Sequence, residues 1–484
     1  MQTLVGISNS SLTDLAHSRI VLLCNSNCEL SILPQSTLLA RDGKQFTFPS
    51  GQNTPDKKSQ LIEKGSELVL TSKHGQLQIC CPAFKFETRE AVFIGSATDK
   101  VNHESSPSFT SSFTISSISR QRANGNVNPH YVGAFVAFAK NDSTRINLVC
   151  DLENYVCGVL QSEVPESYQI EAIKAQAVAA RTYGLHPRID HTRDHANVCD
   201  SYLCCQYFAG SNFELSGKYK NAIAETENQI LTFAGRPILA LFSSNAGGFT
   251  EDYENCFSDN YSSPSIPSKS VDSKAAEKFP GTSLPYLKGV PEGKLEGLEK
   301  DNPHSNEEIL RHIYADKSIV TADSWSTQFR WQVTLCANQL ESHMHHVIET
   351  MLADQQFAPF IVAPKSAQFG HIKGFRAIKR GVSATIMELE IITSTGNWLV
   401  KKELVIRSIF KNPDAKLQRL KSAKFFIDQK RDSLGLLSSI AISGMGWGHG
   451  VGMQQSGAQG MALAGSSYNQ ILAHYFQGAV ISKA

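Results

Sequence analysis

Glu163 stands where a carboxyl group could act as a general acid. It follows apolar residues at helical spacing and precedes Val164 and Pro165, so a helix is expected to end there. The carboxyl end of a helix carries partial negative charge, and apolar neighbours make ionisation more costly. Both effects favour the protonated form, which a proton donor needs near neutral pH. The alternative interpretation is a solvent-exposed loop glutamate.

A second group combines histidine with cysteine. His195, Cys199, Cys204 and Cys205 offer four ligands within residues 195–205, with His191 as the alternate histidine. Zinc prefers four nitrogen and sulfur ligands in tetrahedral arrangement, so the segment is a candidate zinc site. Adjacent cysteines can both bind one metal if the backbone turns between them. A set of unoccupied thiols, or a disulfide in an oxidising compartment, is the alternative.

A third segment, residues 444–452, contains five glycines in nine residues. Such a backbone needs positive φ angles or lets a ligand approach closely. The spacing matches neither a dinucleotide-binding fingerprint nor a P-loop, so nucleotide binding is not predicted. His449 within the segment is a candidate groove residue, although a lone histidine is more often structural.

Short strands and a few helices are expected to position these groups. Helices are predicted at residues 152–162, 168–185, 341–353 and 468–476, and an antiparallel β-meander at 369–405. Ser467 and Gln470 form a capping box for the last helix. The predicted class is α+β, with mostly antiparallel strands and a few helices around a substrate cleft, elaborated by insertions.

Two regions are expected along the chain. We expect residues 1–125 to form a β-rich N-terminal region that ends in a Ser-rich linker, since residues 104–128 offer few groups to pack. We expect residues 126–484 to form a catalytic region with an insertion around 291–335.

Composition restricts the partners. The chain has 484 residues, a net charge of +1 and 41% hydrophobic residues, so nucleic-acid binding is not expected. No apolar run approaches the ~20 residues of a transmembrane helix, and no signal peptide is evident. The 11 cysteines are an odd number, which argues against a complete disulfide framework.

Several motifs together resemble the SpoIID family. They occur in the family's order, over about two thirds of the chain, as EVPESYQIEAIKAQAVAARTY (163–183), CDSYLCCQ (199–206), GGFTE (247–251), PYL (285–287), GWGHGVGM (446–453) and GA (457–458). The long alanine-rich string and the glycine loop are the specific ones. Cys204 stands where the family pattern has a histidine, so the site is expected to differ in charge from that of the family.

The resemblance implies a peptidoglycan lytic transglycosylase of the cell envelope, acting on peptide-stripped glycan strands. It implies that Glu163 is the catalytic residue and that the histidine and cysteine cluster holds zinc in the cleft. We expect this zinc to be structural, because the reaction uses no water. One carboxyl group then serves as acid and base, which agrees with the lack of an evident partner carboxylate in the sequence. Substrate contacts are expected from seven residues: Lys174, Gln176, Arg181, Tyr183, Ser244, Trp447 and His449.

Two other functions remain open from the sequence. Relatives of the family include proteins described as amidase enhancers, so the chain could be a non-catalytic wall-binding protein with a cell-wall amidase as partner. Zinc-dependent hydrolysis is the third class. It predicts reducing MurNAc ends in place of anhydro ends.

Overall fold

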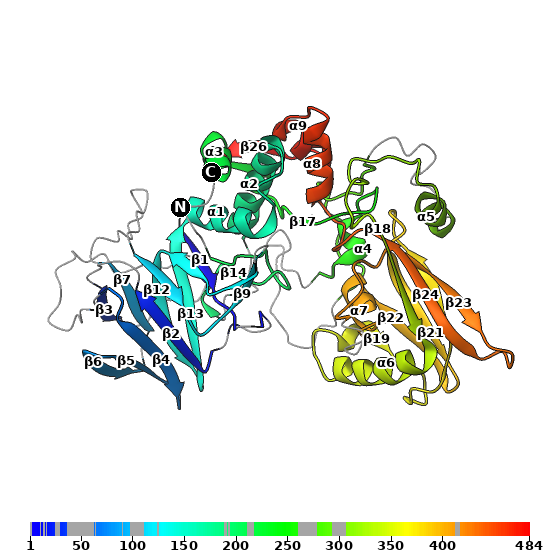
Figure 1. Cartoon of the computed structure of the whole chain (residues 1–484), viewed down its shortest axis with the longest axis horizontal. Coiled ribbons are helices and arrows are strands. Elements are labelled where there is room, and N and C mark those ends of the chain that lie inside the picture. Colours follow the sequence, from blue (N-terminus) through cyan, green and yellow to red (C-terminus); the bar gives the residue numbers. More distant parts are fainter. Residues whose placement is uncertain are drawn as a thin grey trace. The chain divides into compact units, whose positions relative to one another are not determined.

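The computed structural model describes residues 2–9, 11–12, 15, 17–24, 30–35, 62, 64–89, 91–96, 111–122, 125–187, 191, 194–210, 217–259, 278–292, 306–411 and 417–484. The chain forms two compact units, which we describe separately (Figure 1). The N-terminal unit comprises Met1–Ile230 and Ser482–Ala484, and the C-terminal unit comprises Leu231–Ile481. Antiparallel strands with fewer helices confirm the predicted α+β class.

Two six-stranded sheets form the β-rich part of the N-terminal unit. Their strands are Gln2–Gly6 (β1), Arg19–Cys24 (β2), Leu30–Gln35 (β3), Glu67–Lys73 (β4), Gln76–Cys81 (β5), Phe84–Thr88 (β6), Ala91–Ser96 (β7), Ser112–Ile115 (β8), His130–Val132 (β11), Ala134–Lys140 (β12), Ser143–Asp151 (β13) and Val198–Cys199 (β14). The orders are β14-β1-β13-β12-β7-β3 and β11-β8-β2-β4-β5-β6. β14 pairs parallel to β1, and the other neighbours are antiparallel.

Buried aromatic rings fill the space between the two sheets. Phe135 of β12 lies with its ring centroid 4.9 Å from that of Phe113 in β8 and 5.8 Å from that of Tyr131 in β11. All three side chains are buried. The sheets therefore pack face to face, as a two-layer sandwich requires.

The Ser-rich linker predicted before residue 128 is wrong for the residues that the structure describes there. They contain β8 and the hairpin of Arg120–Arg122 (β9) and Gly125–Val127 (β10). Phe113 and Ile115 of β8 are buried while Ser112 and Thr114 are half-buried, which is the alternation of a half-buried strand. Two apolar residues among serines are too short a pattern to predict a strand. Residues 101–110 lie outside the described residues.

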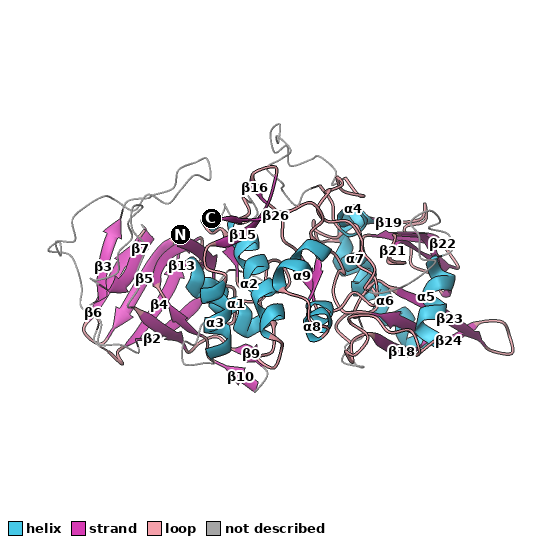
Figure 2. Cartoon of the chain, turned by 90° about the horizontal axis from the view of Figure 1, so that it is seen from above, coloured by secondary structure: helices cyan, strands magenta, loops and turns pink. Residues whose placement is uncertain are grey.

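Three helices, Leu152–Glu163 (α1), Ile170–Leu185 (α2) and Gly217–Glu225 (α3), gather on one side of the sheets in the N-terminal unit (Figures 1 and 2). α1 follows β13 directly, and the Asp151 side chain caps it by accepting the Asn154 N–H at 2.8 Å. α2 is buried almost continuously from Ala172 to Gly184. α1 and α2 confirm the helices predicted at residues 152–162 and 168–185. Apolar spacing and alanine content predict such helices because both are local features of the sequence.

The remaining helices are Tyr253–Cys256 (α4), Asn306–Ala315 (α5), Ala337–Leu352 (α6), Glu403–Ser408 (α7), Gln455–Leu463 (α8), Tyr468–Tyr475 (α9) and the 3₁₀ turn Ala358–Phe360 (η2). The remaining strands are Gln229–Phe233 (β15), Arg236–Pro237 (β16), Phe242–Ser243 (β17), Arg330–Cys336 (β18), Ile361–Val362 (β19), Ile372–Arg380 (β20), Ile386–Thr393 (β21), Gly396–Lys401 (β22), Phe425–Arg431 (β23), Leu437–Met445 (β24), Met453–Gln454 (β25) and Val480–Lys483 (β26).

Two antiparallel sheets, β19-β22-β21-β20 and β18-β24-β23, build the C-terminal unit around a large apolar core. The core includes Met344 of α6, Ile406 of α7 and Trp398 of β22. The predicted β-meander is confirmed as β20, β21 and β22. The capping box of Ser467 and Gln470 is also present at the start of α9.

The glycine-rich segment connects β24 to the short strand β25, which pairs parallel to β17. Gly446 and Gly452 have φ angles of 79° and 73°, which other L-residues rarely adopt. A Cβ on Gly452 would also lie 2.3 Å from the carbonyl oxygen of Leu241. Glycine is therefore required by backbone packing at this position.

No helix among the described residues is long and apolar enough to span a membrane. The predicted boundary at residue 125, the insertion around 291–335 and the substrate cleft stay predictions. Residues 1–125 share their compact unit with residues 126–230.

Candidate active site

Glu163 is the last residue of α1. The helix ends because Val164 takes an extended conformation (φ −127°, ψ 138°) before Pro165. The Glu163 side chain is half-buried, and its Oε1 accepts a 2.7 Å hydrogen bond from the backbone N–H of Tyr207. A segment 44 residues further along the chain therefore orients this carboxyl group.

The segment that contacts Glu163 is fastened to α1 and α2. The backbone N–H of Ala209 donates to Ser162 Oγ at 3.0 Å. The buried Gln206 side chain donates from Nε2 to the Tyr155 hydroxyl at 2.7 Å and to a carbonyl of α2 at 3.1 Å. A buried donor that loses its partner costs about 1–3 kcal/mol, so these bonds favour one placement of the segment.

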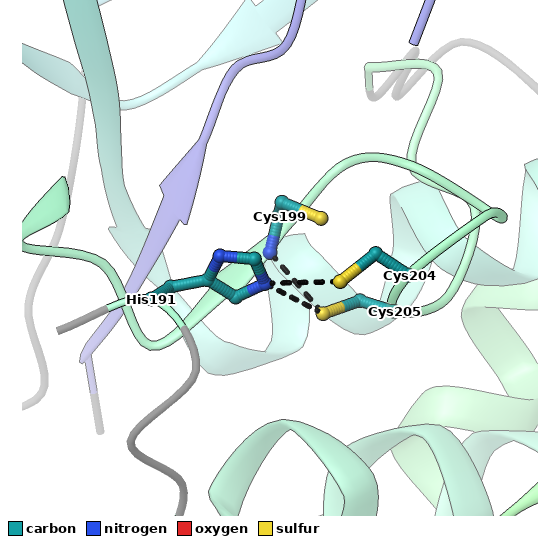
Figure 3. Close-up of side chains that lie close together, drawn as sticks. All are labelled: His191, Cys199, Cys204 and Cys205. Carbon is teal, nitrogen blue, oxygen red and sulfur yellow. Dashed lines mark hydrogen bonds between the residues drawn. The ribbon is translucent and has the colours of Figure 1, made fainter. Parts of the chain in front are cut away.

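One histidine and three cysteines that precede this segment in the chain have side chains that converge (Figure 3). The ligand atoms of His191, Cys199, Cys204 and Cys205 all lie within 4.8 Å of one another. His191 Nε2 is 3.3 Å from Cys205 Sγ and 3.4 Å from Cys204 Sγ. In a tetrahedral zinc site the nitrogen and sulfur ligands are about 3.6 Å apart, so these atoms suit that ion.

The chemistry of the donor set also fits a divalent cation. Hydrogen bonds with Cys204 and Cys205, together with burial, raise the pKa of the Cys199 thiol well above its ordinary value. Metal binding requires thiolates, and the cation offsets their mutual repulsion. These four residues would therefore hold zinc, with more negative charge than a site of two cysteines and two histidines.

The histidine of this group is His191, the alternate, and His195 lies elsewhere. The His195 ring packs on Phe138 of β12, with centroids 5.3 Å apart. Asn147 Nδ2 donates to the carbonyls of Asp194 and His195 at 2.8 and 2.9 Å, which fixes the turn on the sheet. The structure therefore brings the alternate His191, and not His195, together with the three cysteines.

A buried ion pair that the sequence did not suggest anchors the cysteine segment. Asp200 follows Cys199 and accepts from Arg120 Nη2 at 2.6 Å, with no exposed surface on either side chain. Asp200 also accepts from the backbone N–H of Ser8 at 2.9 Å and from the Ser8 hydroxyl. No sequence pattern indicates Arg120, because it lies in the segment predicted to be a linker.

Arg181, predicted to contact substrate, has structural partners. Its side chain has no exposed surface, and Nε and Nη2 donate to the Glu153 carboxylate of α1 at 2.7 and 2.6 Å. Nη1 donates to the carbonyl of Gln229 at 3.0 Å. Arg181 therefore ties α2 to α1 and to the start of β15.

The other three candidates on α2 are also engaged or buried. Lys174 Nζ lies 2.7 Å from Glu171 and 2.5 Å from Glu225 of α3. Gln176 and Tyr183 are buried. Lys174 therefore pairs α2 with α3, while contact of the four residues with substrate stays a prediction.

Ser244, Trp447 and His449 belong to the C-terminal unit. The half-buried Ser244 accepts at its carbonyl from the N–H and the hydroxyl of Ser456, at 3.0 and 2.8 Å. Trp447 exchanges both backbone hydrogen bonds with Asn245, at 2.8 and 3.1 Å, and its side chain is 45% exposed. The structure brings these two candidates together through adjacent residues 244 and 245.

His449 has a structural environment. Its Nδ1 accepts the Val451 N–H at 3.0 Å, and its ring meets Phe257 edge-on with centroids 5.2 Å apart. Desolvation by the surrounding protein lowers the pKa of His449 to about 4, so the imidazole is neutral at pH 7. The structural interpretation of this histidine is favoured.

A buried lysine supports the glycine loops. Lys424 Nζ donates to the carbonyls of Ala246 and Phe249 at 2.5 and 2.6 Å. Glu251, the last residue of the GGFTE motif, is fully buried and accepts from the N–H and hydroxyl of Ser383 at 3.0 and 2.7 Å. Burial raises the pKa of Glu251 and lowers the pKa of Lys424 to about 8. Glu251 could have been found from the sequence, because it belongs to the GGFTE motif. No sequence pattern indicates that Lys424 is buried beneath the glycine loops.

Comparison with known proteins finds two family matches. Residues 140–233 match the family described as Stage II sporulation protein (SpoIID), and residues 273–452 match a domain of unknown function, DUF8618. The first segment contains Glu163 and the four clustered ligands.

Three curated relatives have related descriptions. The amidase enhancer of Bacillus subtilis is 26% identical over 351 residues, which cover 67% of this chain and 40% of that protein. Stage II sporulation protein D of Bacillus amyloliquefaciens is 28% identical over 346 residues, covering 69% and 74%. The protein of that name from Bacillus subtilis is 25% identical over 347 residues, covering 69% and 75%. The matched region thus spans less than half of the amidase enhancer.

Proposed function

Because this chain belongs to the SpoIID-type family and its role is related to the cell wall, we propose that it is a peptidoglycan lytic transglycosylase. It cleaves the MurNAc–GlcNAc bond of peptide-stripped glycan strands in the cell envelope and leaves 1,6-anhydro-MurNAc ends. The observation that supports this most is the half-buried Glu163 carboxyl at the end of α1, oriented by the Tyr207 N–H.

The reaction needs one carboxyl group that first gives and then takes a proton. Protonated Glu163 donates to the glycosidic oxygen while the bond from that oxygen to C1 of MurNAc breaks, and positive charge develops at C1. The C6 hydroxyl oxygen of the same sugar then bonds to C1, and its proton passes to the Glu163 carboxylate. The cycle regenerates the acid and consumes no water.

Tyr207 positions the catalytic carboxyl group. Its backbone N–H donates to Glu163 Oε1 at 2.7 Å, so this oxygen serves as an acceptor while the carboxyl group exchanges its proton with the sugar. The same bond limits rotation of the side chain and keeps the carboxyl group oriented in both steps.

Zinc held by His191, Cys199, Cys204 and Cys205 has a structural role in this proposal. When bound, it supplies a cross-link between ligands that are up to 14 residues apart in the sequence. Cys205 is two residues before Tyr207, so fixing the cysteines also restrains the backbone that donates to Glu163.

The direct test is digestion of purified, peptide-free glycan with mass detection of the released sugars. Anhydro ends are expected, each lighter than a reducing end by one water. Glu163→Gln should lower the rate by about 10²–10⁴-fold, the usual contribution of a general acid and base. Glu166→Gln, a change at an exposed neighbour, is the matched control and should keep the rate. Reducing ends that carry solvent oxygen would contradict the proposal and indicate hydrolysis.

A second candidate is a non-catalytic protein that enhances a cell-wall amidase. The description of the Bacillus subtilis relative as an amidase enhancer favours it. Glu163→Gln separates the two functions, because an enhancer would keep its effect on an amidase while an enzyme would lose turnover.

A further inference from the structure

The four tryptophans of the chain divide into two kinds. Trp331 and Trp398 are buried in the apolar core of the C-terminal unit, at 6% and 2% exposure. Trp325 and Trp447 lie outside the regular strands and helices with 51% and 45% exposure. Exposed tryptophan is uncommon, because its large apolar surface is best buried, so these two positions call for a function beyond packing.

The backbone on either side of Trp447 is fixed. It exchanges two hydrogen bonds with Asn245, and Gly446 N–H donates to the carbonyl of Phe329 at 3.1 Å. Gly448 N–H donates to the carbonyl of Lys421 at 2.9 Å. The exposed indole is therefore carried by a rigid segment, and binding it would cost little conformational entropy.

Lys421 places a positive charge beside this indole. Its Nζ lies 5.4 Å from the centre of the Trp447 ring and donates to Gln328 Oε1 at 2.8 Å. Among the described residues no carboxylate pairs with Lys421. An ammonium group has three donors, and the Gln328 bond uses one of them.

Trp325 is attached to the same framework. Its indole N–H donates to the carbonyl of Ser456 at 3.0 Å, and Ser456 in turn donates to the carbonyl of Ser244. Asn245, the partner of Trp447, donates from Nδ2 to the carbonyl of Asp323 at 3.2 Å. The segments that carry the two exposed indoles are therefore joined through residues 244 and 245.

We propose that Trp325, Trp447 and Lys421 form a saccharide-binding surface that recognises a glycan bearing free carboxylates. All three lie within residues 273–452, the segment that matches the domain of unknown function. The identity of the polymer as peptide-free peptidoglycan glycan rests on the proposed function. The surface itself rests on neither Glu163 nor the metal ligands.

The chemistry of that polymer fits the surface. Pyranose rings present faces of C–H groups that pack on flat aromatic rings, and a fixed indole offers such a ring at little entropic cost. Removal of the stem peptide leaves a lactyl carboxylate on each MurNAc. The Lys421 ammonium beside an indole supplies the matching charge, which would favour stripped strands over strands that still carry peptides.

Calorimetric titration of the full chain carrying Glu163→Gln tests this surface without turnover. The ligands are peptide-free glycan oligosaccharides and uncharged chitooligosaccharides of equal length. Trp325→Ala and Trp447→Ala should each weaken binding of both ligands about tenfold. Lys421→Gln should weaken binding of only the carboxylate-bearing ligand, about threefold, and should reduce the salt dependence of its Kd. Lys421→Arg keeps the positive charge and should therefore retain the affinity and the salt dependence.

Two controls separate binding from folding. Trp325→Phe removes the hydrogen bond to Ser456 but keeps an aromatic ring, so it should retain affinity within about twofold. Leu434→Ala changes another exposed apolar side chain, in the turn between β23 and β24, and should leave binding unchanged.

The outcomes distinguish this inference from the proposed function. The saccharide-binding surface is overturned if the Glu163→Gln protein binds neither oligosaccharide. It is also overturned if the Trp325→Ala and Trp447→Ala variants both bind as tightly as the Glu163→Gln protein. If binding depends on the two tryptophans while the unmodified chain releases no anhydro ends, the surface is supported and the transglycosylase fails. If the unmodified chain releases anhydro ends while binding does not depend on the two tryptophans, the transglycosylase is supported and the surface fails.

Discussion

Asp200→Asn should strongly destabilise the N-terminal unit, because it leaves the Arg120 guanidinium buried without an opposite charge. The two side chains have no exposed surface and approach to 2.6 Å. Asparagine preserves the shape and can still accept from Ser8, so the loss is mainly electrostatic. Removing one partner of a buried ion pair costs about 3–5 kcal/mol, against a typical total of about 5–15 kcal/mol.

Hydrogen exchange followed by mass spectrometry measures this loss where it arises. A cost of about 3–5 kcal/mol corresponds to exchange that is faster by roughly 10²–10³-fold or more in β1 and residues 199–209. Glu87→Gln is the control, since the Lys85–Glu87 pair is 64% and 38% exposed and should contribute less than about 1 kcal/mol. A change of less than about 1 kcal/mol for Asp200→Asn would refute the reasoning.

Three further predictions concern the metal, the glycine loop and a buried acid. Cys199→Ser removes one of four ligands, so it should lower both the zinc content, measured by elemental analysis, and the unfolding temperature of the chain. An unchanged zinc content would exclude these four residues as the zinc site. Gly452→Ala should cost about 2 kcal/mol or more in urea unfolding, because its Cβ would lie 2.3 Å from a carbonyl oxygen, whereas Gly235→Ala, with a similar φ of 74° and no atom within 4 Å, should cost about 1 kcal/mol. Burial raises the pKa of Glu292 from 4.5 to about 8, so the folded state retains a proton that the unfolded state releases and stability falls as pH rises through this window. Glu292→Gln should flatten that fall in unfolding measured from pH 5 to 8, and an unchanged slope would assign it to other groups.

Elements with local signals were predictable from the sequence. The apolar spacing of α1, the alanine content of α2 and the capping box of α9 depend on residues within one helix. The β-meander is likewise a run of consecutive strands. Local patterns predict such elements because their hydrogen bonds close within the segment or with its immediate neighbour.

Features that depend on distant contacts were not predictable. His191 and His195 are equivalent by spacing, and Asn147, which is 48 residues from His195, fixes the turn that separates them. Arg120 pairs with a residue 80 positions away, so a Ser-rich neighbourhood concealed its role. Arg181 resembles a surface residue in sequence, yet its ion pair with Glu153 buries it.

The arrangement in the N-terminal unit links the candidate zinc site to the carboxyl group that the proposed reaction uses. Residues 199–209 carry three cysteines of the candidate zinc site, the buried partner of Arg120 and the N–H that orients Glu163. A disturbance of the cysteines therefore reaches the Glu163 carboxyl group through the backbone between Cys205 and Tyr207. On this reasoning Cys204, where the resemblance to the SpoIID family leads us to expect a histidine, affects the charge of the candidate zinc site but not the backbone path to Glu163, because that path runs through Cys205 and Tyr207.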